Sequence, residues 1–148
     1  MSIDTVGVVG GGQMGGGIAE VGAQAGIAPV VGEVADELAA KSRAGIERSL
    51  DKAVERSKLD DAGRSAALEV LSFATDVGEL AECELVVEAV VERLDVKQEL
   101  FARLDEIVAS STAILASNTS SIPITQIAGA TERPGSVVGR HFFNPAQV

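Results

Sequence analysis

The residues best suited to chemistry lie near the start of the chain, in the segment VGVVGGGQMGGG. Glycines stand there in the spacing GxGxxG at Gly10, Gly12 and Gly15. This spacing is typical of a turn that binds the diphosphate of a dinucleotide: the first glycine makes a tight turn, the second lets the ligand approach the backbone, and the third lets a helix pack closely. A glycine-rich loop without a ligand has the same letters, so the flanking elements must decide.

The flanking elements favour the dinucleotide. The run Thr5–Val9 is apolar and is expected to form a buried strand, and apolar residues recur afterwards at helical spacing. A strand, a glycine turn and a helix in this order place free N–H groups and a helix dipole beside the phosphates. The residues of this turn that we expect to bind the cofactor are Gly10, Gly11, Gly12, Gln13, Met14 and Gly15.

Glu33 follows a second apolar run that contains Val30 and Val31, roughly 20 residues beyond the glycines. A carboxylate at this position accepts hydrogen bonds from the ribose hydroxyls of the adenosine half. It would repel the 2′-phosphate of NADP. The sequence therefore predicts NAD as the cofactor.

Composition excludes several other classes of function. The chain has 148 residues, a net charge of −10 and 46% hydrophobic residues, enough for the core of one domain. An acidic chain without basic clusters or aromatic platforms is not expected to bind nucleic acid or a membrane. No signal segment is evident, so we expect a cytoplasmic protein. Cys83 is expected to be an inert core thiol, and we expect no bound metal.

Helix and strand patterns alternate along the rest of the chain. Six strands with helical crossovers predict an α/β fold of the Rossmann type, a doubly wound and mostly parallel sheet with helices on both faces. Its ligands are expected at the carboxyl ends of the strands. Helices are expected later in the chain at 35–57, 61–71 and 95–110. The first of them has Leu38, Ile46 and Leu50 on one side. Strands are expected at 72–74, 85–91, 113–116 and 136–141.

Four blocks in order carry a resemblance to a known family: VVGGGQMGGGIAE, LVVEAVVERLDVKQELF, ASNTSS and GRHFFNP. Together they make residues 1–148 resemble the NAD-binding domain of the 3-hydroxyacyl-CoA dehydrogenases, including the bacterial 3-hydroxybutyryl-CoA dehydrogenases of fatty acid metabolism. The resemblance implies reversible oxidation of a 3-hydroxyacyl-CoA with hydride transfer to NAD. It also implies a second, helical domain after the last block, which this sequence does not include.

The resemblance assigns roles to individual residues. His141 stands where the family has its general base, and Ser120 where a serine bonds the 3-oxygen of the substrate; Asn118 lies near the nicotinamide. By the same match Glu92 and Lys97 contact the cofactor. Ser49 contacts CoA, and Arg56 or Lys58 stands where the family has a lysine near the CoA phosphates.

Structural alternatives remain for all of these residues. His141 can close a strand with a structural bond, and Ser120 and Asn118 can be helix caps, with Ser121 the better cap. Glu92 and Lys97 can be a surface pair, and the charged helix can be a solvated face.

Without the second domain, His141 lacks the family's partner glutamate, so we expect this chain to bind NAD but to turn over acyl-CoA poorly or not at all. Two other functions stay open. One is a non-catalytic NAD-binding or assembly module, and the other is a dehydrogenase of a hydroxy acid that is free or bound to a carrier protein. An apolar face would also favour self-association, so we expect a homo-oligomer.

Overall fold

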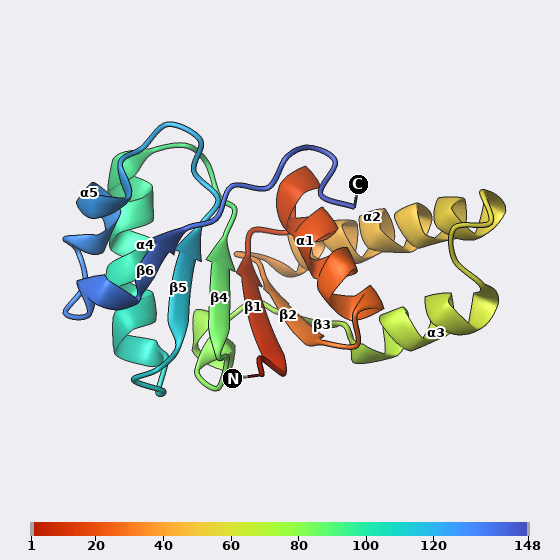
Figure 1. Ribbon diagram of the computed structural model, residues 1–148, viewed down its shortest axis with the longest axis horizontal. Helices are drawn as coiled ribbons and strands as arrows, with labels where there is room; N and C mark the ends of the chain where they lie inside the picture. Colours follow the sequence, from red (N-terminus) through yellow and green to blue (C-terminus); the bar gives the residue numbers. More distant parts are fainter. Residues whose placement is uncertain (1, 148) are drawn as a thin grey trace.

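The apolar runs form the strands of one six-stranded sheet in the computed structural model, which describes residues 2–147 (Figure 1). The strands lie in the order β3-β2-β1-β4-β5-β6, and all five pairings between neighbours are parallel. This is the doubly wound arrangement that the sequence predicts. The strands are β1 (Thr5–Val9), β2 (Ala28–Gly32), β3 (Ser72–Ala74), β4 (Leu85–Glu88), β5 (Ile114–Ser117) and β6 (Val137–Gly139).

The strand order reverses between β1 and β4. The chain moves outward from β1 through β2 to β3, then crosses back to β4 and continues outward to β6. The carboxyl ends of β1 and β4 therefore diverge into loops on opposite sides. Such a reversal makes a crevice at this edge of the sheet, where doubly wound proteins bind their ligands.

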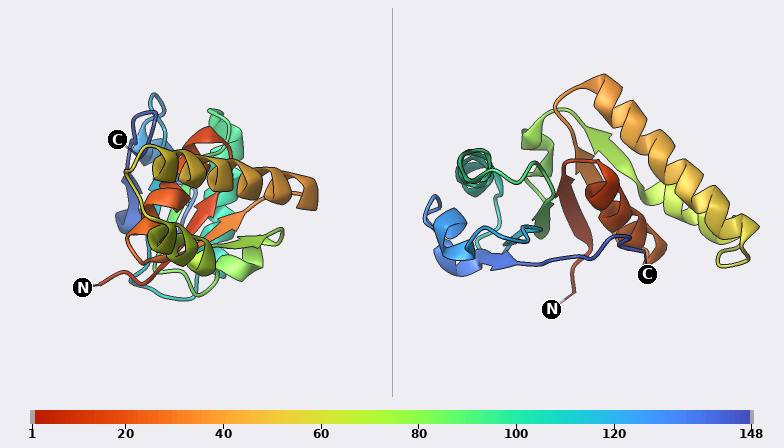
Figure 2. Two further views of the ribbon diagram at one scale, coloured as in Figure 1. Left: turned by 90° about the vertical axis from the view of Figure 1, so that its right-hand side faces the viewer. Right: turned by 90° about the horizontal axis from the view of Figure 1, so that it is seen from above.

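Helices cover both faces of the sheet. The helices α1, α2 and α3 lie together on one face, and α4 and α5 on the other (Figure 2). The pair α2 and α3 extends beyond the sheet at one end of the molecule. The helices are α1 (Gln13–Gln24), α2 (Asp36–Glu55), α3 (Asp61–Val70), α4 (Leu94–Ile107) and α5 (Ile124–Ala128), with the short 3-10 turns η1 (Val77–Leu80) and η2 (Pro134–Ser136).

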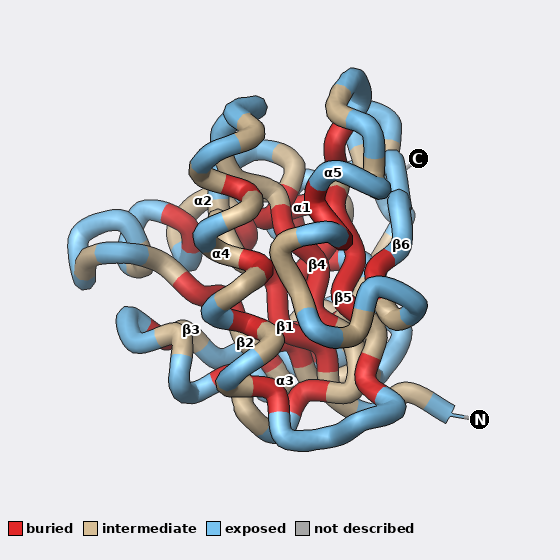
Figure 3. The backbone as a smooth tube through the Cα atoms, turned by 90° about the vertical axis from the view of Figure 1, so that its left-hand side faces the viewer, coloured by how far each residue is buried: buried red, intermediate tan, exposed pale blue. Residues whose placement is uncertain are grey.

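The core consists of two clusters, one on each face of the sheet. Val8, Leu50 and Val87 belong to the cluster under α1, α2 and α3, whereas Val86 and Phe101 belong to the cluster under α4 and α5. The neighbours Val86 and Val87 enter different clusters because successive side chains of a strand point to opposite faces. The most buried backbone accordingly follows β1, β4 and β5 (Figure 3).

Two strands are shorter than the sequence predicts. β4 ends at Glu88 and does not continue to position 91, because the Glu88 carboxylate accepts a hydrogen bond from the backbone N–H of Val90, two residues further on, at 2.8 Å. β6 ends at Gly139, so His141 follows the strand and does not belong to it. These corrections place the chemically interesting side chains in loops beyond the sheet edge.

The last residues return across the carboxyl edge of the sheet to α1 (Figure 1). The Gln147 side-chain amide donates to the buried carboxylate of Glu20 at 2.8 Å, and Ala146 packs against Gly17. This segment therefore covers the open side of α1.

Cys83 is buried, as expected, and burial together with the charges of Glu82 and Glu84 raises the pKa of its thiol to about 11. A thiol with this pKa is a poor nucleophile at neutral pH. Within residues 2–147, none of the helices is both long and apolar enough to span a bilayer.

Candidate functional site

The glycine turn joins β1 to α1 with the shape that the sequence predicts. Gly10 has a φ of +92°, which glycine adopts without strain. A Cβ at Gly15 would collide with the carbonyl oxygen of Gly10, so the helix can start this close to the strand only with glycine there. A Cβ at Gly12 would meet no protein atom within 4 Å. The outer side of the turn is therefore open.

The N-terminus of α1 fits an anionic group. Gly12 is the N-cap and supplies no side-chain cap, and the first turn of the helix contains no acidic residue. The first N–H groups of a helix have no intrahelical acceptor, and the dipole there favours negative charge. A diphosphate lying over Gly12 would satisfy these donors, and the open side of the turn leaves room for it.

Glu33 lies directly after β2 and faces the glycine turn. Its Oε1 accepts a hydrogen bond from the backbone N–H of Gly11 at 2.6 Å, and its own backbone N–H donates to Ala74 at 2.9 Å. The second carboxylate oxygen remains available to a ligand. The structure therefore brings Glu33 to the place where the sequence predicts an acceptor for a ribose.

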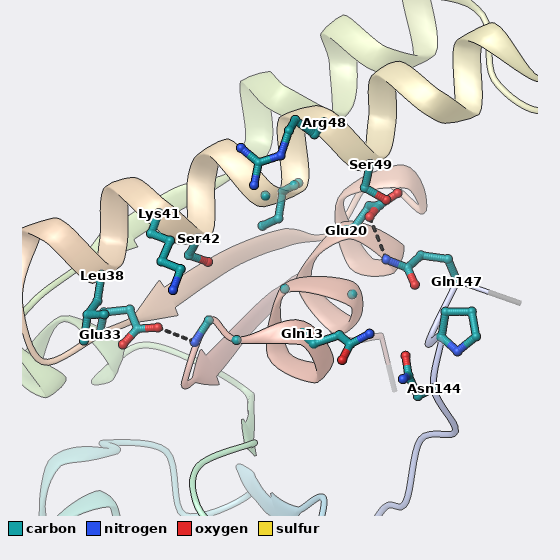
Figure 4. A pocket seen from close by; sticks show the side chains of 17 residues that line it. Gln13, Glu20, Glu33, Leu38, Lys41, Ser42, Arg48, Ser49, Asn144 and Gln147 are labelled. Atoms are coloured by element: carbon teal, nitrogen blue, oxygen red, sulfur yellow. Dashed lines mark hydrogen bonds between the residues drawn. The ribbon is translucent and has the colours of Figure 1, made fainter.

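A cleft of about 520 Å³, here called the α1–α2 cleft, extends from Glu33 along the two helices (Figure 4). Lys41, Arg48 and Ser49 line it from α2. Arg56 does not, because it lies two turns beyond Ser49 at the exposed end of the helix. Of the two residues expected to contact CoA, Ser49 therefore lines the cleft and Arg56 lies outside it.

Leu38 also lines the α1–α2 cleft and is exposed, although the helical spacing placed it with the core residues of α2. Ile46 and Leu50, two and three turns further on, are buried as expected. An apolar side chain at the mouth of a cleft suits the flat face of a ligand.

Ser42 is a cleft residue that sequence reasoning missed. Its side chain is 5% exposed, and its Oγ has no hydrogen-bond partner among the described residues. It sits against Gly11, where any Cβ would collide with the Ser42 hydroxyl and crowd Glu33. The close approach of Ser42 on α2 and of Glu33 after β2 explains why this position of the turn is glycine.

A second cleft of about 460 Å³, here called the histidine cleft, opens on the other side of β1. It gathers the ends of four strands: Met14 follows β1, Glu92 follows β4, Asn118 and Ser120 follow β5, and His141 follows β6. The sequence singled out all five positions. The structure brings them to one hollow although they span most of the chain.

His141 is exposed, and its ring meets the ring of Phe143 edge to face at a centroid distance of 5.1 Å. No hydrogen bond to its imidazole occurs within residues 2–147. Asn118 positions the segment, since its Oδ1 accepts from the backbone N–H of Phe142 at 2.8 Å. The structural alternative for His141, a bond that closes a strand, is therefore not what the structure contains.

The helix-cap alternatives were wrong in detail. The residue that precedes α5 is Pro123, and Ser121 instead donates its hydroxyl to Glu92 at 3.2 Å. Thr119 stabilises the turn before α5, because its hydroxyl oxygen accepts a hydrogen bond from the backbone N–H of Ile122 at 3.0 Å. Ser120 is exposed and lines the histidine cleft.

Glu92 and Lys97 do not form a surface pair. Lys97 is 1% exposed, and its ammonium lies 3.5 Å from Glu92 and 2.5 Å from Glu88. Burial opposes ionisation of Glu92, but hydrogen bonds from Thr119 and Ser121 and the charge of Lys97 outweigh it and lower the pKa of this carboxyl. Glu92 therefore presents an ionised carboxylate to the histidine cleft.

Glu88 is the second residue that sequence reasoning did not assign. It is fully buried and accepts hydrogen bonds from Lys97 and, at 2.5 Å, from the Ser117 hydroxyl. The signal was present in the sequence: a carboxylate within an apolar strand needs a buried partner. The partner, nine residues away on α4, follows only from the fold.

Across residues 2–147, no group of three or more histidine, cysteine or acidic side chains lies close enough to hold a metal ion.

The comparisons with known proteins agree with this geometry. Residues 5–148 match the family described as the 3-hydroxyacyl-CoA dehydrogenase, NAD binding domain. A 3-hydroxybutyryl-CoA dehydrogenase of Mycobacterium tuberculosis is 51% identical over 147 residues, which are 99% of this chain and 51% of the relative. The human mitochondrial hydroxyacyl-coenzyme A dehydrogenase is 45% identical over 95% of this chain and 46% of its own length. The chain thus spans about half of these relatives.

Solved structures show the same fold. The crystal structure of M. tuberculosis FadB2 superposes with a TM-score of 0.97 at 51% identity, covering 99% of this chain and 51% of that protein. The structure of 3-hydroxybutyryl-CoA dehydrogenase from Escherichia coli gives a TM-score of 0.96 at 42% identity, covering all of this chain and 31% of that protein.

Proposed function

The chain belongs to the 3-hydroxyacyl-CoA dehydrogenases as their NAD-binding domain, and we propose that it serves the reversible oxidation of a 3-hydroxyacyl-CoA to the 3-ketoacyl-CoA. One observation carries the proposal: the histidine cleft gathers His141, Ser120, Asn118 and Glu92 beside the N-terminus of α1. With its adenosine end at Glu33, a dinucleotide bound by the glycine turn would have its nicotinamide end at this cleft.

The residues of both clefts would hold NAD in this proposal. Gly12 and the first turn of α1 would hold its diphosphate, and the second carboxylate oxygen of Glu33 would accept from its adenosine ribose. When bound, NAD supplies the hydride acceptor. β1 lies between the strands that precede Glu33 and Glu92, and the space outside Gly12 at its end is open, so Gly12 would leave room there for the diphosphate.

His141 takes the proton in this proposal. Its imidazole accepts the proton of the substrate's 3-hydroxyl as a hydride leaves C3, and returns that proton in the reductive direction. Ser120 donates its hydroxyl to the same oxygen, on which negative charge develops. Asn118 keeps the histidine segment in place through its bond to Phe142.

A kinetic and a binding measurement together test this function. We expect NAD to bind to the 148-residue chain in a calorimetric titration, and acetoacetyl-CoA to be reduced by NADH with the polypeptide encoded by the complete reading frame. His141→Ala should lower kcat at least about 100-fold, with little change in the Kd for NAD. Normal NAD binding without any reduction of acetoacetyl-CoA by the unaltered polypeptide would refute the reaction.

The acyl carrier is tested separately, on α2. Ser49 lines the α1–α2 cleft together with Lys41 and Arg48, and Arg56 follows the last residue of α2, outside the cleft. If CoA is the carrier, the double variant Ser49→Ala/Arg56→Gln should raise the KM for acetoacetyl-CoA and leave kcat unchanged. If the double variant instead raises the KM more for the same acyl group attached to a carrier protein, the carrier protein is favoured as the substrate.

A further inference from the structure

A chain of three alternating charges runs from the core to the histidine cleft. The buried Glu88 contacts the buried Lys97 ammonium at 2.5 Å, and Lys97 in turn lies 3.5 Å from the carboxylate of Glu92. Glu92 is the member that faces the cleft, with 39% of its side chain exposed. Two carboxylates and one ammonium leave this group with one negative charge.

The hydrogen bonds fix how that charge is distributed. Glu88 is held from three sides, by Lys97, by the Ser117 hydroxyl at 2.5 Å and by the Val90 N–H at 2.8 Å. The short contact pairs the Lys97 ammonium with the Glu88 carboxylate. The contact between Lys97 and Glu92 is longer, so the negative charge of Glu92 is only partly compensated. Thr119 and Ser121 bind the Glu92 carboxylate from its other side as neutral donors.

No positive side chain of the histidine cleft cancels this charge. The residues that line it include no lysine or arginine among those the structure describes. Arg140 stacks over Phe142 at 5.3 Å but is exposed to solvent, which screens its charge. The negative charge at Glu92 thus acts on whatever occupies the cleft.

We propose that Glu88, by pairing with Lys97, keeps Glu92 negative toward the cofactor and so favours the oxidised nicotinamide over the reduced one. The oxidised ring carries one positive charge and the reduced ring none, so a nearby carboxylate stabilises only the former. Glu88 is in this sense a positioning residue: it acts through Lys97 and never touches the cofactor. The inference rests on the proposed placement of NAD.

Glu88→Gln gives the central test, with the Kd of NAD⁺ and of NADH measured separately by titration of the 148-residue chain. The glutamine keeps the shape of the side chain but leaves Lys97 to neutralise Glu92. We expect the ratio of the two Kd values to shift toward NADH on the order of threefold to tenfold. Equal weakening of both forms would mean a purely structural role and would overturn the proposal.

A double variant separates charge from structure. Glu88→Gln/Lys97→Met removes one negative and one positive charge together, so Glu92 again carries the full charge. The ratio of Kd values should return toward that of the unaltered chain, which damage to the fold cannot produce. Ser117→Ala removes a hydrogen bond to Glu88 without changing any charge, and it should leave the ratio where it was.

Glu92→Gln keeps the test possible if the Glu88 variants do not fold. It removes the same charge at a partly exposed position, and it too should shift the ratio toward NADH; an unchanged ratio would contradict the proposal. If the unaltered chain binds neither form of the cofactor, the failure lies in the proposed function and not in this charge arrangement.

Discussion

The Glu33 carboxylate accepts a hydrogen bond from the Gly11 N–H at 2.6 Å, which ties the end of β2 to the turn after β1. Two neighbouring strands thereby fix the position of an acidic group relative to the N-terminus of α1. The same residue thus stabilises the turn through one oxygen and offers the other to a ligand.

This relationship predicts how Glu33→Gln behaves. The amide oxygen can still accept from Gly11, so the turn should survive, but the charge that repels a 2′-phosphate is gone. We expect the Kd for NAD to rise roughly tenfold and the Kd for NADP to fall relative to it. Calorimetric titrations with both cofactors measure this, and Glu37→Gln, an exposed charge in the first turn of α2 outside the cleft, is the matched control. An unchanged preference would remove Glu33 from the site.

Two glycines of the turn should respond in opposite ways to alanine. A Cβ at Gly12 meets no protein atom within 4 Å, so Gly12→Ala should unfold at nearly the unaltered temperature and lose NAD affinity about tenfold or more, because the methyl group takes the place of the ligand. Gly15→Ala forces a collision with Gly10 and should lower stability by roughly 1–3 kcal/mol. Thermal melts and NAD titrations of both variants check the contrast. Unimpaired binding by Gly12→Ala would place the diphosphate elsewhere.

The lowered pKa of Glu92 predicts a pH-dependent stability. Its stabilising effect is complete above the pKa of the unfolded state, near 4.3, and is lost as the pH falls through the lower pKa of the folded state. The difference in Tm between the unaltered chain and Glu92→Gln should therefore be roughly 1–3 °C at pH 7 and shrink below pH 4; partial exposure keeps it small.

Calorimetric scans between pH 3 and pH 7 measure this difference. Glu99→Gln, at an exposed position of α4 on the same part of the chain, is the control. A difference that stays constant over this range would show that Glu92 gains no stabilisation from its charge.

Outside the site, we expect the replacement of Arg133 to cause the largest loss in the free energy of unfolding. Its guanidinium donates to Asp105 Oδ1 at 2.5 Å and to the backbone carbonyls of Asp105, Val108 and Ser110, which closes the end of α4. Because these bonds are mostly shielded from water, Arg133→Ala should cost about 2–3 kcal/mol. Urea denaturation measures the change. Arg133→Lys should recover little of it, since one ammonium cannot reach several acceptors; full recovery would contradict this account.

Most of the fold could be predicted from local patterns. The strand–turn–helix order at Gly10–Gly15 and the apolar runs are short-range signals. Strand ends were less accurate. Leu85–Val91 reads as one apolar run, but the Glu88 carboxylate binds the backbone two residues on and ends the strand early.

The sequence predicted which residues belong to the candidate site, but not which of them contact one another. Motifs identified His141, Ser120 and Glu92, but nothing in the sequence paired Lys97 with Glu88 or set Ser42 against Gly11. Such contacts join residues whose separation along the chain has no fixed period, so only the packing of α4 on the sheet and of α2 on α1 creates them.

The sequence by itself determined the parallel sheet, the glycine turn, the acidic residue after β2 and the family, because each depends on residue type and short spacing. Tertiary structure decided which of the charged residues meet. Lys97, on α4, is buried between two carboxylates, whereas Arg56, directly after the last residue of α2, stays in solvent. The reason is physical: a charge enters the interior only where the fold supplies a partner, and the partner comes from another element.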